Sequence, residues 1–395
     1  MNYSQVYAWA TYDLANTAFS ALFVTFFFPF YIKEFLGGNE FQVGLVFGIS
    51  ILFVGLLVPF LGAWSDAVKR RLPFIGIFTL LCSTAVIFVG YVPLVYALIA
   101  GASANFFYHA ALTTYNALLL NVSTPKNRGW VSGIGIGLGY LGTLLSLVMA
   151  GVILSVLGWE TKEGVRGVFV GTALFFLVFA SILFLFFDEK KQKQTLPHPL
   201  RAGLQEIKHT WQQARKHTNL LWFMLSMLFF GDGMNAVILF LFLYARSVME
   251  MPVKGFMLVY VIFSLAAMIG SLIAGKASDV LGAKKTLQLA GIIWMGVVLS
   301  LLYFSNLTAF IIAGSLGGIA LGTIWTAMRP LTIRLSPHKN IGQFFGYLEL
   351  TDKFSGVLGP IIFGYLAAHV SYAAALGSLL VFFIGGLAAL TKVKV

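Results

Sequence analysis

One short segment occurs twice in this chain, and both copies lie between long apolar stretches. The first copy reads Gly62-Ala-Trp-Ser-Asp66 and the second reads Gly275-Lys-Ala-Ser-Asp279. The two glycines and the two aspartates are both 213 residues apart (275 − 62 and 279 − 66). A duplicated half inside a membrane is typical of transporters built from two related bundles, with the solute bound between them.

A second pair of segments repeats with nearly the same spacing. Asp13-Leu-Ala-Asn16 is matched by Asp232-Gly-Met-Asn235, at an offset of 219 (232 − 13). We therefore expect these carboxylates and amides to occupy equivalent positions in the two halves.

The chain is too apolar to fold in water. Hydrophobic residues make up 59% of it and charged residues only 10%, against roughly half and a quarter in soluble domains. Twelve stretches approach the roughly 20 apolar residues that span a bilayer: Val6–Ile32, Gly44–Trp64, Phe74–Tyr91, Leu94–Leu119, Trp130–Leu157, Val165–Phe187, Leu221–Tyr244, Phe256–Gly275, Thr286–Phe304, Thr308–Leu331, Phe344–His369 and Tyr372–Leu390. We predict an all-α integral membrane fold of twelve transmembrane helices in two pseudo-symmetric six-helix bundles.

One long polar stretch divides the spans into six and six. The predicted domains are residues 1–187, a cytoplasmic linker at 188–219, and residues 220–395. In the linker, apolar residues recur at helical spacing: Leu200, Leu204, Ile207, Trp211 and Ala214. This pattern predicts a basic amphipathic helix, which lies either on the anionic inner leaflet or against the bundle.

The net charge of +12 invites a nucleic-acid interpretation, which the placement of the basic residues argues against. With a cytoplasmic N-terminus, external loops hold only Lys33, Lys162, Arg166, Arg246 and Lys254, and nearly all the other basic residues fall in cytoplasmic segments. This asymmetry predicts that both termini are cytoplasmic, in a membrane expected to be a bacterial inner membrane.

The chemistry-bearing motifs of enzymes are missing from the sequence. Cys82 is the only cysteine, so no intrachain disulfide or cysteine-based metal site can form. No GxxxxGK[ST] loop, HExxH pair or nucleophile constellation occurs. We therefore predict no enzymatic activity, no cofactor and no metal.

Glycines crowd the fifth span, from Gly133 to Gly142. The stretch Gly137–Gly142 matches GxGxxG, but no strand precedes it, which argues against a dinucleotide site. Glycines at four-residue spacing allow another helix to approach closely, so we predict a packing and sliding face.

Charged groups inside a bilayer are costly and are functional candidates by default. Asp13 is followed three residues later by Asn16, and Asp232 by Asn235, so each pair shares a helix face. Each carboxylate could take up a proton or hold a cationic group of the substrate. The alternative is that each one only locks its helix to a neighbour.

The eleventh span carries Glu349, Asp352 and Lys353. Glu349 and Lys353 are four residues apart and can pair along a helix. We expect this cluster to serve gating or coupling, although charges near a helix end can also reach the membrane surface.

The fourth span carries a polar stripe. Asn105, His109 and Thr113 follow at four-residue spacing, with Asn116 close to the same stripe. His109 titrates near neutrality and is a candidate proton relay. A histidine that only bonds a neighbouring helix is the alternative.

The duplicated Gly–Asp segments are candidate gating elements. We expect Gly62 and Gly275 to form tight turns, and Asp66 and Asp279 to cap facing helices. The basic residues that follow, Arg70, Arg71, Lys284 and Lys285, would fix topology and pair with carboxylates. Such a latch can close in one state and open in the other, whereas a single copy would be an ordinary polar turn.

These two segments resemble the G-x-x-x-D-x-x-G-R-K signature of the major facilitator superfamily. The first copy departs at Lys69, where glycine is usual, and the second at Ala283, where arginine is usual. Four further segments resemble the vacuole-effluxer-like branch, whose fungal members export amino acids from the vacuole: Tyr12-Asp13-Leu-Ala-Asn16-Thr-Ala-Phe, Tyr115-Asn116-Ala-Leu-Leu, Gly137-Leu-Gly139-Tyr-Leu-Gly142, and Phe344-Phe345-Gly346 through Gly359-Pro360.

The resemblance implies a secondary transporter that works by alternating access around a cavity lined by spans 1, 4, 7 and 10. It implies that the solute is small and polar, an amino acid or similar metabolite, and that it is exported. From the charged residues inside the spans we predict that protonation of Asp232, with Asp13 or His109, couples transport to the proton gradient. The phenylalanine-rich spans leave efflux of amphipathic compounds open, and a non-transporting sensor or scaffold is a further alternative. The expected partners are the solute, protons and lipid, and we expect a monomer.

Overall fold

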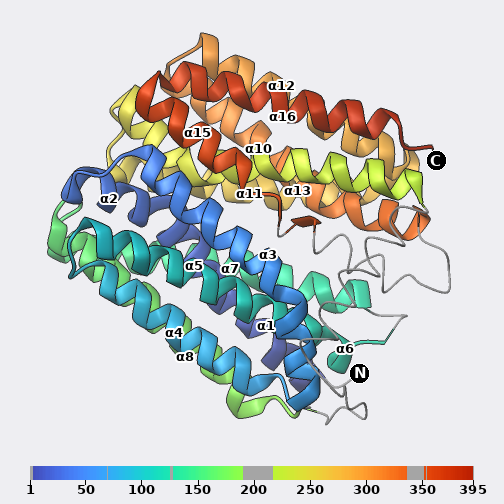
Figure 1. Cartoon of the computed structure of the whole chain (residues 1–395), viewed down its shortest axis with the longest axis horizontal. Helices are drawn as coiled ribbons and strands as arrows, with labels where there is room; N and C mark the ends of the chain where they lie inside the picture. Colours follow the sequence, from blue (N-terminus) through green and yellow to red (C-terminus); the bar gives the residue numbers. More distant parts are fainter. Residues whose placement is uncertain are drawn as a thin grey trace. The chain divides into compact units, whose positions relative to one another are not determined.

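The computed structural model describes residues 3–68, 70–124, 128–189, 217–335, 351–352 and 354–394. Throughout these residues the ordered elements are helices and no strand occurs. Their bounds are α1 Tyr3–Ala18, η1 Phe19–Phe27, α2 Phe28–Leu36, α3 Glu40–Val68, α4 Leu72–Val89, α5 Leu94–Ala117, α6 Leu119–Val122, α7 Arg128–Leu157, α8 Lys162–Phe186, α10 Thr218–Met249, α11 Val253–Val280, α12 Ala283–Tyr303, α13 Leu307–Leu335, α15 Leu358–His369 and α16 Tyr372–Thr391 (Figure 1).

Eleven helical segments in the described residues are long and apolar enough to cross a membrane, where α1, η1 and α2 count as one continuous segment, Tyr3–Leu36. The helix α15 is a shorter apolar helix. The expected eleventh span, Phe344–His369, overlaps residues outside the described ranges, and α15 is its second part. Large apolar side chains face outward along these helices: Val156 is 78% exposed and Leu272 is 70% exposed. Lipid is the solvent that accommodates such a surface, so the predicted all-helical membrane fold is confirmed.

Two compact units divide the chain, Met1–Gly38 with Ile49–Lys208, and Asn39–Gly48 with His209–Val395. The start of α3 thus clusters with the second unit, although it belongs to the first half in sequence. The start of α3 packs closely on α15 in this unit. A Cβ added to Gly44 would lie only 2.2 Å from the Pro360 carbonyl oxygen. The Tyr372 hydroxyl at the start of α16 donates to Glu40 Oε1 at 2.5 Å in the same region.

In the first unit, α1 packs on the glycine face of α7. A Cβ on Gly142 would lie 2.1 Å from the Leu14 carbonyl oxygen, so only glycine fits there. Thr17 Oγ1 donates to the Gly139 carbonyl at 2.8 Å. The predicted close approach along the fifth span is therefore confirmed, and α1 is the helix that makes it.

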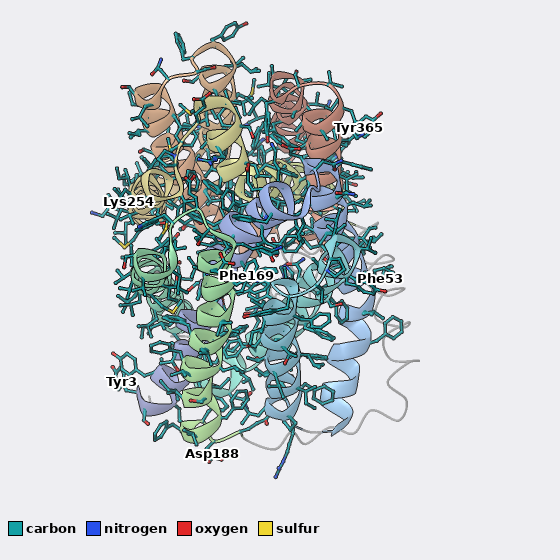
Figure 2. The ribbon with its side chains drawn as sticks, turned by 90° about the vertical axis from the view of Figure 1, so that its left-hand side faces the viewer. Tyr3, Phe53, Phe169, Asp188, Lys254 and Tyr365 are labelled. Carbon is teal, nitrogen blue, oxygen red and sulfur yellow. The ribbon has the colours of Figure 1, made fainter. Side chains whose placement is uncertain are left out.

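The ends of the first unit's helices are held by side chains. Thr161 Oγ1 caps α8 by accepting from Gly164 N at 2.9 Å. At the other end of α8, Gln5 donates to the Phe186 carbonyl at 2.9 Å and accepts from Asp188 N at 2.8 Å. Tyr3 and Asp188 consequently lie at the same end of this unit (Figure 2).

Span 1 is not a uniform α-helix. Between α1 and α2 it passes through nine residues of π-helix, Phe19–Phe27, whose backbone ends with Phe28 N–H donating to the Phe23 carbonyl five residues earlier. Such segments are uncommon and are often found at functional sites.

Candidate functional site

Asp13 is the polar centre of the first unit. It is half-buried on α1, and its Oδ2 accepts from the Tyr115 hydroxyl at 2.9 Å. Asn16 Nδ2 donates to its Oδ1 at 3.3 Å, which confirms that carboxylate and amide share a helix face. A Cβ on Gly135 would lie 2.4 Å from Asp13 Oδ2, so the carboxylate also lies directly against α7.

Packed aromatic rings fix the position of the Tyr115 hydroxyl that contacts Asp13. The Tyr115 ring stacks on Trp9 with centroids 5.1 Å apart, and Tyr12 packs on it at 4.6 Å. The Tyr115 hydroxyl lies 3.1 Å from the Trp9 carbonyl, and the Tyr12 hydroxyl shares a 2.7 Å hydrogen bond with Thr79 on α4. Since these bonds fix the rings, the hydroxyl that donates to Asp13 is preorganised.

The polar stripe of the fourth span lies on α5. Asn105 is 1% exposed and donates to Ser50 Oγ at 2.7 Å, so it bonds a neighbouring helix. The His109 ring packs edge-on against Tyr108 with centroids 5.0 Å apart, and Thr113 Oγ1 donates to the His109 carbonyl within the same helix. Asn116 lies next to Tyr115 near the end of α5.

Asp232 occupies a different environment from Asp13. It lies in the middle of α10 and is 1% exposed. Its Oδ1 accepts from Gly356 N at 2.8 Å and from Gly359 N at 2.9 Å. Both donors belong to the first turn of α15 or the residues just before it, so the carboxylate caps this helix from another span.

Span 11 is interrupted where Asp232 meets it. After helical Thr351 and Asp352 the chain turns through Ser355–Val357, with Gly356 at φ +111°, before α15 begins. Asn235 Nδ2 donates to the Ser355 carbonyl at 3.1 Å. Asp232 and Asn235 therefore act together as a clamp on this turn, instead of bonding each other as Asp13 and Asn16 do.

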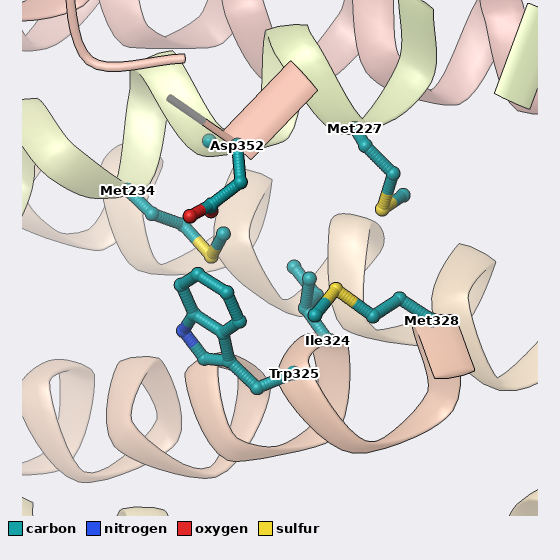
Figure 3. Close-up of a pocket in the computed structure, with 7 residues that line it drawn as sticks. Met227, Met234, Ile324, Trp325, Met328 and Asp352 are labelled. Carbon is teal, nitrogen blue, oxygen red and sulfur yellow. The ribbon is translucent and has the colours of Figure 1, made fainter. Parts of the chain in front are cut away.

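A pocket opens beside this clamp within the second unit. Its described lining comes from α10, α13 and span 11, and consists of Met227, Gly231, Met234, Ile324, Trp325, Met328 and Asp352. Its cavity volume is about 20 Å³, which is room for about one water molecule. We call it the methionine pocket (Figure 3). Glu349 and Lys353, the other charges predicted in this span, lie outside the described residues.

The first duplicated segment is helical, which corrects the expectation of a glycine turn. Gly62 and Asp66 lie within α3, which continues to Val68. The helix continues because alanine, tryptophan and valine around these positions favour no turn. Exposed Arg70 and buried Arg71 lie two and three residues beyond the end of this helix.

Arg71 links three segments of the first unit. Its Nη1 donates to the carbonyl of Ala117, the last residue of α5, at 2.9 Å. Its backbone N–H donates to Glu189 Oε1, and Leu72 N–H donates to Glu189 Oε2. Glu189 therefore caps the N-terminus of α4 from beyond the end of α8.

The second duplicated segment is helical as well. Gly275 and Asp279 lie within α11, and the turn forms at Gly282, whose φ is +86°. Lys284 Nζ donates to the carbonyl of Val393 at 2.6 Å and to that of Thr391 at 3.3 Å. This lysine thus binds the C-terminal end of α16, while Lys285 follows it on α12.

Several residues of these sites were not singled out from the sequence. Glu189 falls in the predicted cytoplasmic linker, and Trp325 and the three pocket methionines look like ordinary apolar positions in spans. Met227 and Met234 are seven residues apart on α10, a helical spacing that places them on one face. Core packing produces the same spacing, so the spacing alone does not indicate a pocket.

Comparison with known proteins is consistent with this architecture. The Major Facilitator Superfamily profile matches residues 14–270 and 255–394. An uncharacterized protein of Aquifex aeolicus (strain VF5) is 26% identical over 363 residues, which cover 91% of this chain and 88% of that protein. The uncharacterized MFS-type transporter YxiO of Bacillus subtilis (strain 168) is 23% identical over 403 residues, covering 98% and 94%.

Among solved structures, the crystal structure of the nucleoside transporter NupG superposes with a TM-score of 0.80 at 13% identity. The match covers 99% of this chain and 100% of that one. At this identity the likeness concerns the fold alone. The family profile extends over nearly all the spans, and the chain therefore belongs to the Major Facilitator Superfamily and is an integral membrane transporter with that fold.

Proposed function

We propose that this transporter is a secondary active exporter of a small solute and works by alternating access with proton coupling. The observation that carries the coupling is Asp13. It is a half-buried carboxylate inside a span, hydrogen-bonded by a tyrosine hydroxyl at 2.9 Å and an asparagine amide at 3.3 Å. A carboxylate that neutral donors hold in place and that keeps partial access can gain and lose a proton as its surroundings change.

Asp232 has a different part in this proposal. Its oxygen holds two backbone N–H groups of span 11, so it positions α15 next to the methionine pocket. His109, beside Tyr108 on α5, remains a second candidate for passing protons. The distribution of basic residues supports an inner-membrane location with cytoplasmic termini.

The solute proposed first is an amino acid or a similar small polar metabolite, which the sequence resemblance to the vacuole-effluxer-like branch supports. A second candidate is an amphipathic compound. The observation in its favour is the lining of the methionine pocket, where thioether, isoleucine and indole side chains surround one carboxylate.

Proteoliposomes that contain a pH-sensitive dye test the coupling. We expect a solute pool to move protons through the wild-type protein, and Asp13→Asn to reduce that signal to the level of empty liposomes while the protein stays folded. The matched control is Asp188→Asn, which removes an exposed carboxylate just after α8. Amino-acid pools are applied first and amphipathic pools second.

Two outcomes contradict the proposal at different levels. Solute flux that is independent of pH and unchanged in Asp13→Asn would rule out coupling at this residue and leave transport intact. If no pool produces a proton signal while a known proton-coupled transporter works in the same lipid as a positive control, a sensor or scaffold would be favoured.

A further inference from the structure

We infer that Tyr115 is a positioning residue for proton uptake, and that its hydroxyl changes from donor to acceptor toward Asp13 when this carboxylate gains a proton. The inference rests on the proposed function, because it describes how the coupling carboxylate is held in its two protonation states. It follows from the hydrogen bonds of Asp13 and from the second acceptor that the tyrosine hydroxyl has within reach.

Asn16 determines which oxygen of Asp13 carries the added proton. Its Nδ2 donates to Asp13 Oδ1 at 3.3 Å. An amide nitrogen has two N–H donors and no acceptor position, so a proton on Oδ1 would face a donor and this bond would be lost. The favoured position for the proton is therefore Oδ2, the oxygen that faces Tyr115.

The Tyr115 hydroxyl has two acceptors within hydrogen-bond distance and one proton to donate. Asp13 Oδ2 lies 2.9 Å from it, and the Trp9 carbonyl oxygen lies 3.1 Å from it. Hydrogen bonds to an ionised group are about twice as strong as those between neutral groups. The hydroxyl therefore donates to Asp13 while the carboxylate is ionised.

Protonation of Oδ2 reverses this bond. The new O–H of Asp13 donates to the Tyr115 oxygen, and the tyrosine proton turns to the Trp9 carbonyl. One proton from water is added to Oδ2, Tyr115 keeps its own proton, and only the tyrosine hydroxyl rotates about its C–O bond. Each of these polar groups keeps a partner in both states, so neither state leaves a buried hydrogen bond unmade.

Packing holds the Tyr115 oxygen in place while its proton turns. Tyr115 and Tyr12 are fully buried, and the rings of Trp9 and Tyr12 both pack on Tyr115. The Tyr12 hydroxyl is hydrogen-bonded to Thr79 Oγ1 on α4 at 2.7 Å. Because no ring has to move, the exchange requires the rotation of one hydroxyl and leaves the backbone unchanged.

The titratable neighbours of this site lie on three helices. They are Tyr12 on α1, Cys82 on α4, and Tyr108, His109 and Tyr115 on α5. The helix α7 meets Asp13 at Gly135, and α8 contacts Tyr12 through Phe176. Tyrosine and cysteine are ordinarily neutral where carboxylates titrate. A carboxyl signal can therefore be followed separately from these groups, and an imidazole signal is distinguished by its own bands.

Infrared difference spectroscopy of the purified full-length protein in lipid tests the exchange. The pH is lowered in steps, and the spectrum of the ionised state is subtracted. We expect a carboxylic C=O band that Asp13→Asn removes. We expect a tyrosine C–O band to change with it, because this vibration differs between a hydroxyl that only donates and one that also accepts. Ring-deuterated tyrosine identifies the second band.

Matched variants assign the tyrosine signal to one residue. Tyr115→Phe is expected to lose the tyrosine change and to keep the Asp13 carboxyl band. The control is Tyr12→Phe, which removes a hydroxyl from an equally buried ring whose partner is Thr79, and it is expected to keep both signals. Replacement of Tyr115 by 3,5-difluorotyrosine keeps the ring and the hydroxyl, and is expected to move the tyrosine signal to a new frequency. This replacement tests the assignment even if Tyr115→Phe does not fold.

The inference is overturned if the Asp13 carboxyl band appears without a tyrosine change, or if folded Tyr115→Phe keeps that change. It is also overturned if the difluorotyrosine protein gives the tyrosine signal at its wild-type frequency. Each of these outcomes leaves proton uptake by Asp13, and with it the proposed function, intact. If no carboxyl band that depends on Asp13 appears at any pH at which the protein stays folded, coupling at Asp13 is contradicted together with the exchange.

Discussion

Gly142→Leu is expected to leave almost no folded protein, whereas Gly137→Leu on the same helix is expected to be tolerated. A Cβ at position 142 would lie 2.1 Å from the Leu14 carbonyl oxygen, inside any possible contact distance, and the obstacle is backbone. A Cβ at position 137 meets nothing within 4 Å. Overpacking of this kind costs about 3 kcal/mol or more, because α1 and α7 must separate.

The measurement is the yield of monodisperse protein in detergent, together with the midpoint of thermal unfolding. Both variants add the same side chain to the same helix, so differences in hydrophobicity and helix propensity cancel. Equal yields and equal midpoints for the two variants would show that α1 and α7 do not depend on this contact.

Asp232→Ala is expected to destabilise the protein strongly, and Asp232→Asn much less. Alanine leaves the N–H groups of Gly356 and Gly359 without their acceptor inside the second unit. Losing two charge-assisted hydrogen bonds costs about 3 kcal/mol or more. Asparagine keeps an amide oxygen that can accept both N–H groups, so α15 should stay in place.

Thermal unfolding of the two variants in detergent separates a positioning role from a role of the charge itself. Asp188→Ala, at an exposed carboxylate, controls for the loss of an acid. If Asp232→Asn is as unstable as Asp232→Ala, the negative charge is what span 11 requires. If both variants match the wild type, the clamp does not hold α15.

The spans were predictable because their signal is local. Leu94–Leu119 was expected and α5 covers Leu94–Ala117; Trp130–Leu157 was expected and α7 covers Arg128–Leu157. Span 2 was expected to end at Trp64, but α3 continues to Val68. Hydropathy detects only the part of a helix that lies in hydrocarbon, whereas the helix itself continues as long as its backbone bonds are satisfied.

The roles of the candidate residues were only partly predictable. Asp13 and Asn16 share a face because three-residue spacing in a helix dictates it, and the structure shows their hydrogen bond. Asp232 and Asn235 have the same spacing but bond the turn at Ser355–Gly359, more than a hundred residues away. Periodicity contains no information about such a partner, nor about the interruption of span 11 that exposes those N–H groups.

The π-helical stretch of span 1 has a consequence for comparing this chain with others. Backbone bonds that reach back five residues fit an additional residue into each turn relative to an α-helix. From Asp13 to Phe28, through Phe19–Phe27, the chain therefore contains at least one residue more than an α-helix with the same side-chain directions at both ends. An alignment to a relative whose first span is α-helical needs a gap inside this stretch. Without the gap, the position matched to Asp13 would face a different neighbour.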